Sequence, residues 1–233
     1  MLPLKDDVPS RSFPLFTVML IAANVAAFLY QLSLQMAPAG PTREAAAAFV
    51  MEFGAVPCRL TGACPIDEFP APIVTVFTSM FLHGGLFHIA GNMLYLWIFG
   101  DNVEDTLGHF RFLALYLLAG VGAAVAQTAI NPESRIPMVG ASGAISGVLG
   151  AYLFLFPHAS VLTLITFGFF IRFVHIPAVI VLGFWIVVQV LNGVISARQS
   201  VDTGGVAWFA HIGGFVAGVV LLFLFRPRGT RRL

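Results

Sequence analysis

Long apolar runs separated by short polar segments dominate the chain. A helix needs about 20 mainly apolar residues to cross the hydrocarbon core of a bilayer. Six runs reach or approach this length and predict six membrane-spanning helices, at residues 13–36, 86–100, 110–129, 142–157, 176–195 and 206–225. We therefore expect an all-α polytopic membrane protein with a six-span domain over residues 13–225.

The segments between these runs predict loops of different kinds. Residues 37–72 hold six prolines and predict a long first outer loop without regular structure. The apolar run at 73–82 is too short to span, which favours an interfacial or re-entrant piece. A charged turn is expected at 101–105. Residues 161–171 are also too short and are followed by Arg172 and His175.

Composition agrees with a membrane protein. Hydrophobic residues make up 58% of the 233 residues and charged residues 10%, whereas soluble domains carry roughly 25% charged residues. The net charge of +1 gives no broad basic surface for nucleic acid, so none is expected as a partner. The expected surroundings are a lipid bilayer.

Basic residues predict the orientation of the spans. With six spans both termini lie on one side, and cytoplasmic termini place eight basic residues inside and four outside, as the positive-inside rule prefers. Residues 1–12 are then a cytoplasmic N-terminal segment, and residues 226–233 are a basic cytoplasmic tail. A seventh span at 161–171 would send the arginine-rich tail outside.

Four polar residues interrupt the apolar runs at similar depth. His88 and Asn92, Ser142, and His211 each fall near the outer end of a predicted span. Polar groups within a span are costly and point to function. A serine hydroxyl needs a base within hydrogen-bond reach, and neutral imidazole suits that role. The acids of 101–105 lie roughly 20 Å from His88 along the helix, so a Ser142–His211 dyad is favoured over a triad.

The neighbours of these residues extend the hypothesis. His88 and Asn92 are four residues apart and share a helix face, so both can donate to an oxyanion, together with the Ser142 amide. The alternative is a polar pair that only joins helices. Two GxxxG motifs, Gly143 to Gly147 and Gly214 to Gly218, follow the serine and the histidine. Such glycines allow close helix packing in lipid, which is also their simplest interpretation.

Several segments together resemble the rhomboid intramembrane serine proteases. They are HGGLFHIAGN at 83–92, GDNVED at 100–105 with Gly108 and Arg111, GASG at 140–143, and AHIGG at 210–214. The resemblance implies a rhomboid-like bundle that hydrolyses transmembrane protein substrates, with Ser142 as nucleophile and His211 as base, and needs no metal or other cofactor. It also implies that His88 and Asn92 support the oxyanion, and that His83, Gly140 and Gly143 shape the cavity. A bacterial inner membrane is the expected location.

The chain departs from the family pattern at two places. Ser146 occupies the position where an aromatic ring usually packs on the catalytic histidine. Either His211 is held less firmly without that ring, or Phe209 or another aromatic substitutes for it. The Trp-Arg pair usual in the first loop is also not evident. Cys58 and Cys64 form either a local disulfide or two free thiols.

Three other functions compete with the protease. A catalytically silent relative that binds membrane proteins would typically lack the serine or the histidine. A metal site would use His83, His88 and His211, and leaves Ser142 unexplained. A transporter would be expected to show an internal repeat and an intramembrane acid, and we find neither in the sequence.

Overall fold

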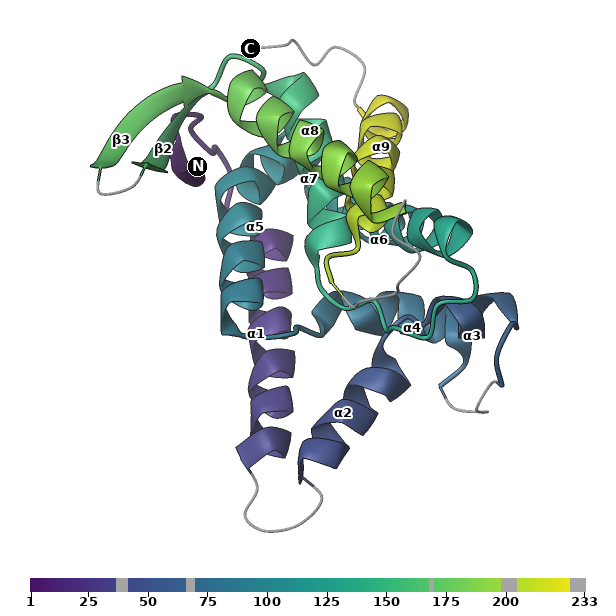
Figure 1. Cartoon of the computed structure of the whole chain (residues 1–233). Coiled ribbons are helices and arrows are strands. Elements are labelled where there is room, and N and C mark those ends of the chain that lie inside the picture. The colour runs from purple at the N-terminus through teal and green to yellow at the C-terminus, as the bar shows by residue number, and fades with distance from the viewer. Residues whose placement is uncertain (37–41, 66–69, 168–169, 198–204, 227–233) are drawn as a thin grey trace.

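The computed structural model describes residues 1–36, 42–65, 70–167, 170–197 and 205–226. Its helices are α1 (Leu15–Met36), α2 (Thr42–Phe53), α3 (Pro57–Thr61), α4 (Pro72–Thr78), the 3-10 turn η1 (Ser79–Phe81), α5 (Leu86–Leu107), α6 (His109–Ile130), α7 (Ser142–Leu155), α8 (Ala178–Ala197) and α9 (Trp208–Phe225). Figure 1 shows α2–α4 at one end of the helical bundle and strands β2 and β3 at the other.

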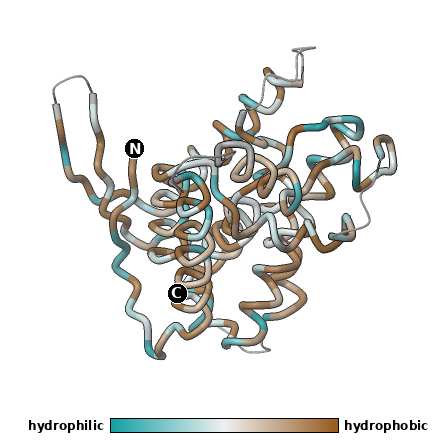
Figure 2. Tube along the Cα trace, turned by 90° about the horizontal axis from the view of Figure 1, so that it is seen from below, coloured by the Kyte–Doolittle hydropathy of each residue, from teal (hydrophilic) through white to brown (hydrophobic). Residues whose placement is uncertain are grey.

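Within the described ranges, four helices are long and apolar enough to cross a membrane, namely α1, α6, α8 and α9. A fifth span is possible if α4–η1 and α5, which meet at a bend of 84°, are counted as one broken span. Figure 2 shows hydrophobic residues along most of the helical traces. The structure thus confirms a polytopic membrane protein, whereas the count of six spans stays a prediction.

Helix α7 explains the difference in the count. It has only 14 residues, or roughly 21 Å of helix, whereas the hydrocarbon core measures about 30 Å. Helices α5, α6 and α9 pack against it, and every residue from Gly143 to Tyr152 is buried. A helix this short does not span the hydrocarbon core by its own length, and its neighbours shield it instead.

The two GxxxG motifs lie against each other where α7 meets α9. A Cβ atom added to Gly214 would lie 2.0 Å from the Gly143 carbonyl oxygen. One added to Gly218 would lie 2.1 Å from the Gly147 carbonyl oxygen. Only glycine permits backbones to approach this closely.

The expectation of an all-α fold is wrong in one part of the chain. Strands β1 (Leu2–Asp6), β2 (Ser160–Phe167) and β3 (Phe170–Pro177) form an antiparallel sheet in the order β1-β2-β3. The described residues of the short apolar run at 161–171 therefore lie in two paired strands, with β-branched residues suited to strands; residues 168–169 lie outside the described part. Burial raises the pKa of Asp6, at the end of β1, to about 6, and the Tyr152 hydroxyl donates a hydrogen bond to this carboxyl group.

Two other loop predictions need correction. The segment 37–72 carries helices α2 and α3, and a disulfide joins Cys58 to Cys64; residues 37–41 and 66–69 lie outside the described part. The charged turn at 101–105 is helical, because α5 continues to Leu107. Two of its acids contact the segment before α1, since Ser10 donates to Asp101 and Ser12 to Asp105.

Glu104 is the central anchor of that contact. Its fully buried carboxylate accepts hydrogen bonds from the backbone N–H groups of Phe16 and Thr17 at 2.9 and 2.8 Å. The Thr17 hydroxyl donates to it at 2.7 Å, and His109 Nδ1 lies at 2.6 Å. One side chain thus satisfies the free amides at the beginning of α1.

Glu104→Gln should destabilise the protein by about 2–4 kcal/mol, because the amide group turns an acceptor into a donor among buried donors. Asp105→Asn is the matched control, since its bonds are exposed and should be worth at most about 1 kcal/mol. Thermal unfolding in detergent micelles measures both. Equal midpoints for the two variants would contradict the anchoring role of Glu104.

Candidate functional site

Ser142 and His211 lie in hydrogen-bond contact although 69 residues separate them. Ser142 is the first residue of α7, and His211 lies in the first turn of α9. The Ser142 Oγ atom lies 2.8 Å from His211 Nε2. The close approach of α7 and α9 just below this pair brings the two helix starts together.

The other ring nitrogen of His211 contacts Gln189 on α8. His211 Nδ1 lies 2.8 Å from Gln189 Oε1, and Gln189 Nε2 donates to the Trp185 carbonyl oxygen at 3.2 Å. Because the amide nitrogen must donate to a carbonyl, the amide oxygen faces His211 and accepts from Nδ1–H. The imidazole is then assigned the tautomer whose Nε2 accepts the serine proton.

Two tryptophan rings enclose His211. The Trp185 ring centroid lies 5.9 Å from that of His211 at an interplanar angle of 36°, and Trp208 meets it edge-on at 6.4 Å. Ser146 donates instead to the Ser142 carbonyl oxygen of its own helix at 2.6 Å. Phe209 lies against Gly193 of α8. The expected aromatic contact therefore comes from Trp185 and Trp208 rather than from Phe209.

His88 lies on the other side of Ser142. The backbone N–H of Gly84 donates to His88 Nδ1 at 3.2 Å, so His88 Nε2 carries the ring proton and can donate. Gly140 has a φ of +123°, and a Cβ there would lie 2.8 Å from His88 Nε2 and 3.5 Å from Ser142 Oγ. Glycine at 140 thus fits both the backbone conformation and the space.

Asn92 and His83 support this ring. Asn92 is buried, and its Nδ2 lies 2.9 Å from His83 Nε2. The His83 ring meets the His88 ring edge-on at 5.1 Å. Gln31 of α1 contacts the His83 backbone on both sides, accepting from its N–H at 2.9 Å and donating to its carbonyl at 3.3 Å. Hydrogen bonds therefore join Asn92, His83 and Gln31, and the His88 ring packs against this group.

These groups face a common cavity of about 970 Å³. Ser142, His211, His88 and Asn92 line it, while Tyr95, Ile145 and Leu149 provide apolar walls further along α5 and α7. Such a mixture of apolar walls and a few convergent polar groups is typical of a binding site. Gly143 lies behind Ser142, where a Cβ would meet Ala123 of α6 at 2.6 Å, so it serves packing between helices.

Gln189 and Trp185 were missed by the sequence analysis, although a signal existed for one of them. Gln189 is an uncharged polar residue within an otherwise apolar run, and it is only 5% exposed. It lies in the middle of the run, whereas the polar residues selected from the sequence lie near the outer ends of their spans. Within the described part of the chain, no three His, Cys, Asp or Glu side chains gather as a metal site would need.

Comparison with known proteins identifies relatives. The Rhomboid domain family matches residues 70–228. RHOMBOID-like protein 1 of Arabidopsis thaliana is 34% identical over 66% of the chain, and Rhomboid protein 1, mitochondrial, of Saccharomyces cerevisiae is 29% identical over 63%. Rhomboid protease GluP of Bacillus subtilis is 35% identical over 61%. The matches span 35%, 40% and 24% of the lengths of these three relatives.

The family match covers well over half of the chain and includes both helix starts that meet at the site. The hydrogen-bonded serine and histidine lie on α7 and α9, within the matched residues. The chain therefore belongs to the rhomboid family.

Proposed function

We propose that this protein is an intramembrane serine endopeptidase that hydrolyses peptide bonds in or near transmembrane segments of other membrane proteins. The observation that carries the proposal is the contact between Ser142 Oγ and His211 Nε2 at 2.8 Å. Both side chains line a cavity inside the helical bundle. The name of the Bacillus subtilis relative, a rhomboid protease, supports the same reaction.

The contact supports nucleophilic catalysis in two steps. Ser142 Oγ attacks the scissile carbonyl carbon while His211 Nε2 takes the hydroxyl proton. The tetrahedral intermediate collapses to an acyl-enzyme, and His211 gives this proton to the departing amine. A water molecule then loses a proton to His211 and attacks the ester, which releases the second product and restores Ser142.

The negative charge on the carbonyl oxygen needs donors that are already in place. The Ser142 amide, at the start of α7, has no intrahelical acceptor. His88 Nε2–H lies beside it at the Gly140 surface, and the second N–H of the Asn92 amide completes the set. These are the roles we propose for the three residues.

The disulfide and the basic residues support the orientation that we propose. Disulfides form in oxidising compartments, so the loop with Cys58 and Cys64 is assigned to the outer side. The first strand, β1, lies at the opposite end of the bundle (Figure 1). We propose six membrane crossings, made by α1, α5, α6, α7, α8 and α9, with residues 1–12 and 226–233 in the cytoplasm of a bacterial cell.

A catalytically silent membrane-protein binding factor is the second candidate. It would keep the cavity and the fold without using the serine. The hydrogen bonds that orient His211, from Nδ1 to Gln189 and from Ser142 to Nε2, favour the enzyme, because a binding factor needs neither.

Gln189→Leu should lower kcat by about tenfold and leave KM nearly unchanged, because the residue positions His211 and lies outside substrate reach. Gln189→Glu, which can still accept from Nδ1–H, should recover most of the activity. Gln35→Leu, the same change at an exposed position on α1, is the control. Kinetics on a fluorogenic transmembrane peptide in micelles measures them, and a change confined to KM would contradict the positioning role.

Cleavage of a single-span substrate in liposomes tests the proposed function itself. Ser142→Ala and His211→Ala should each reduce the rate by at least about 10³-fold, and a metal chelator should have no effect on the wild type. Activity that survives Ser142→Ala but disappears with chelator would move the assignment to a metal site formed by histidines. Binding of the substrate without cleavage by the wild type would favour the silent factor.

A further inference from the structure

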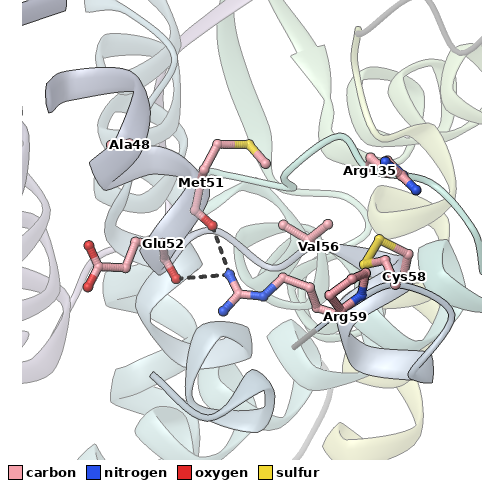
Figure 3. Close-up of a pocket in the computed structure, with 9 residues that line it drawn as sticks. Ala48, Met51, Glu52, Val56, Cys58, Arg59 and Arg135 are labelled. Atoms are coloured by element: carbon pink, nitrogen blue, oxygen red, sulfur yellow. Dashed lines mark hydrogen bonds between the residues drawn. A yellow bond between two sulfur atoms is a disulfide. The ribbon is translucent and has the colours of Figure 1, made fainter. Parts of the chain in front are cut away.

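A second cavity, of about 520 Å³, lies away from Ser142 and His211 in the loop between α1 and α4. Helices α2 and α3 enclose it together with the segment after α6. Its lining includes two arginines, Arg59 and Arg135, the Cys58–Cys64 disulfide and Glu52. Figure 3 shows the Arg59 side chain reaching from α3 toward the end of α2.

Arg59 is buried and only partly satisfied. Its side chain is 8% exposed, and Nη1 donates to the carbonyl oxygens of Met51 and Glu52 at 3.0 and 3.5 Å. Among the described residues, neither Nε nor Nη2 has a hydrogen-bond partner. Three of the five N–H donors of a guanidinium group belong to these two nitrogens.

Among the described residues that line the cavity, no side chain forms an ion pair with Arg59. Glu52 contacts Arg59 through its backbone oxygen, and Figure 3 shows its carboxylate turned away from the guanidinium. Arg135 adds a second positive charge to the lining. A buried, unpaired charge is strongly unfavourable, so the arrangement needs an anion from outside the described residues.

The unpaired edge of Arg59 selects the kind of anion. Nε–H and one Nη2–H point in the same direction from the planar group and match two oxygens of one oxyanion. The loop lies at the end of the bundle away from the sheet, with α2 beside α1 (Figure 1). A phosphate group therefore fits this position in the loop, either in a lipid headgroup or as a free ion.

The two cavities share a wall. Cys58 N–H donates to the Ser134 carbonyl at 3.0 Å, and Ala55 and Met138 exchange two backbone hydrogen bonds of 3.1 and 2.8 Å. Pro57 and Ser134 line the cavity of Ser142, whereas Cys58 and Arg135 line the cavity of Arg59. An anion on Arg59 would thus stabilise the loop that bounds the catalytic cavity.

We propose that Arg59, assisted by Arg135, binds a phosphate oxyanion in this outer loop. The site is separate from the proposed catalytic residues, and binding is measured without reference to cleavage. In dodecyl maltoside, which contains no phosphate, inorganic phosphate should raise the unfolding midpoint saturably by about 5 °C over chloride at equal ionic strength. Dihexanoyl phosphatidylglycerol, compared with dihexanoylglycerol, tests the lipid headgroup in the same assay.

Arg59→Gln should weaken phosphate binding at least tenfold, and Arg135→Gln should weaken it by less. Arg172→Gln, at an exposed position on β3, should leave phosphate binding unchanged. Arg59→Lys keeps the charge but loses the paired donors, so it tests the site even if Arg59→Gln folds poorly. A response to phosphate assigns a free ion, and a response only to the phospholipid assigns the headgroup.

Two results would overturn the proposal. One is the absence of any saturable stabilisation by phosphate or phospholipid in the wild type. The other is phosphate binding that appears only in an Asp67→Asn, Glu68→Gln double variant, because a carboxylate of this chain would then already occupy Arg59. Residues 66–69 lie outside the described part of the structure.

Discussion

The site depends on the contact between the backbones of α7 and α9. At Gly143–Gly214 and Gly147–Gly218 there is no room for a single Cβ atom. In a bilayer, close van der Waals packing is the main force that holds helices together, because lipid is as apolar as the side chains. The contact sets the distance between two helix starts, and Ser142 and His211 occupy those starts.

The burial of α7 adds a second constraint. This helix has 14 residues, and α5, α6 and α9 pack around it, so the polar side chain of its first residue lies within the helical bundle. Buried polar groups must be paired. The structure pairs them in two groups, in which His211 contacts Ser142 and Gln189, and His83 contacts Asn92 and Gln31.

The apolar pattern predicted most of this architecture because the pattern is local. Runs of about 20 apolar residues correspond to α1, α6, α8 and α9, and polar interruptions pointed to Ser142, His211, His88 and Asn92. The sheet was not predictable in the same way, since β2 pairs with Leu2–Asp6, more than 150 residues away along the chain. The acids of α5 suggested a turn because their partners, Ser10, Ser12 and Thr17, also lie far away along the chain.

Gln189 and Trp185 illustrate the same limit within the site. Neither residue stands out in its own segment. Each contacts His211 only because α8 packs beside α9. The missing aromatic ring at Ser146 indicated that something else must hold His211, but the replacement came from another helix. Arg59 is similar, since its unpaired donors become visible only when the surrounding loop is folded.

The glycine contact is tested most directly by the reactivity of Ser142 toward a fluorophosphonate probe in Gly214→Ala. A methyl group at 214 must push α7 and α9 apart, so the labelling rate of folded, monodisperse protein should fall about 10²-fold. Gly183→Ala on α8, where a Cβ meets nothing within 4 Å, should label like the wild type. A Gly214→Ala protein that labels at the wild-type rate would contradict the dependence of the site on this contact.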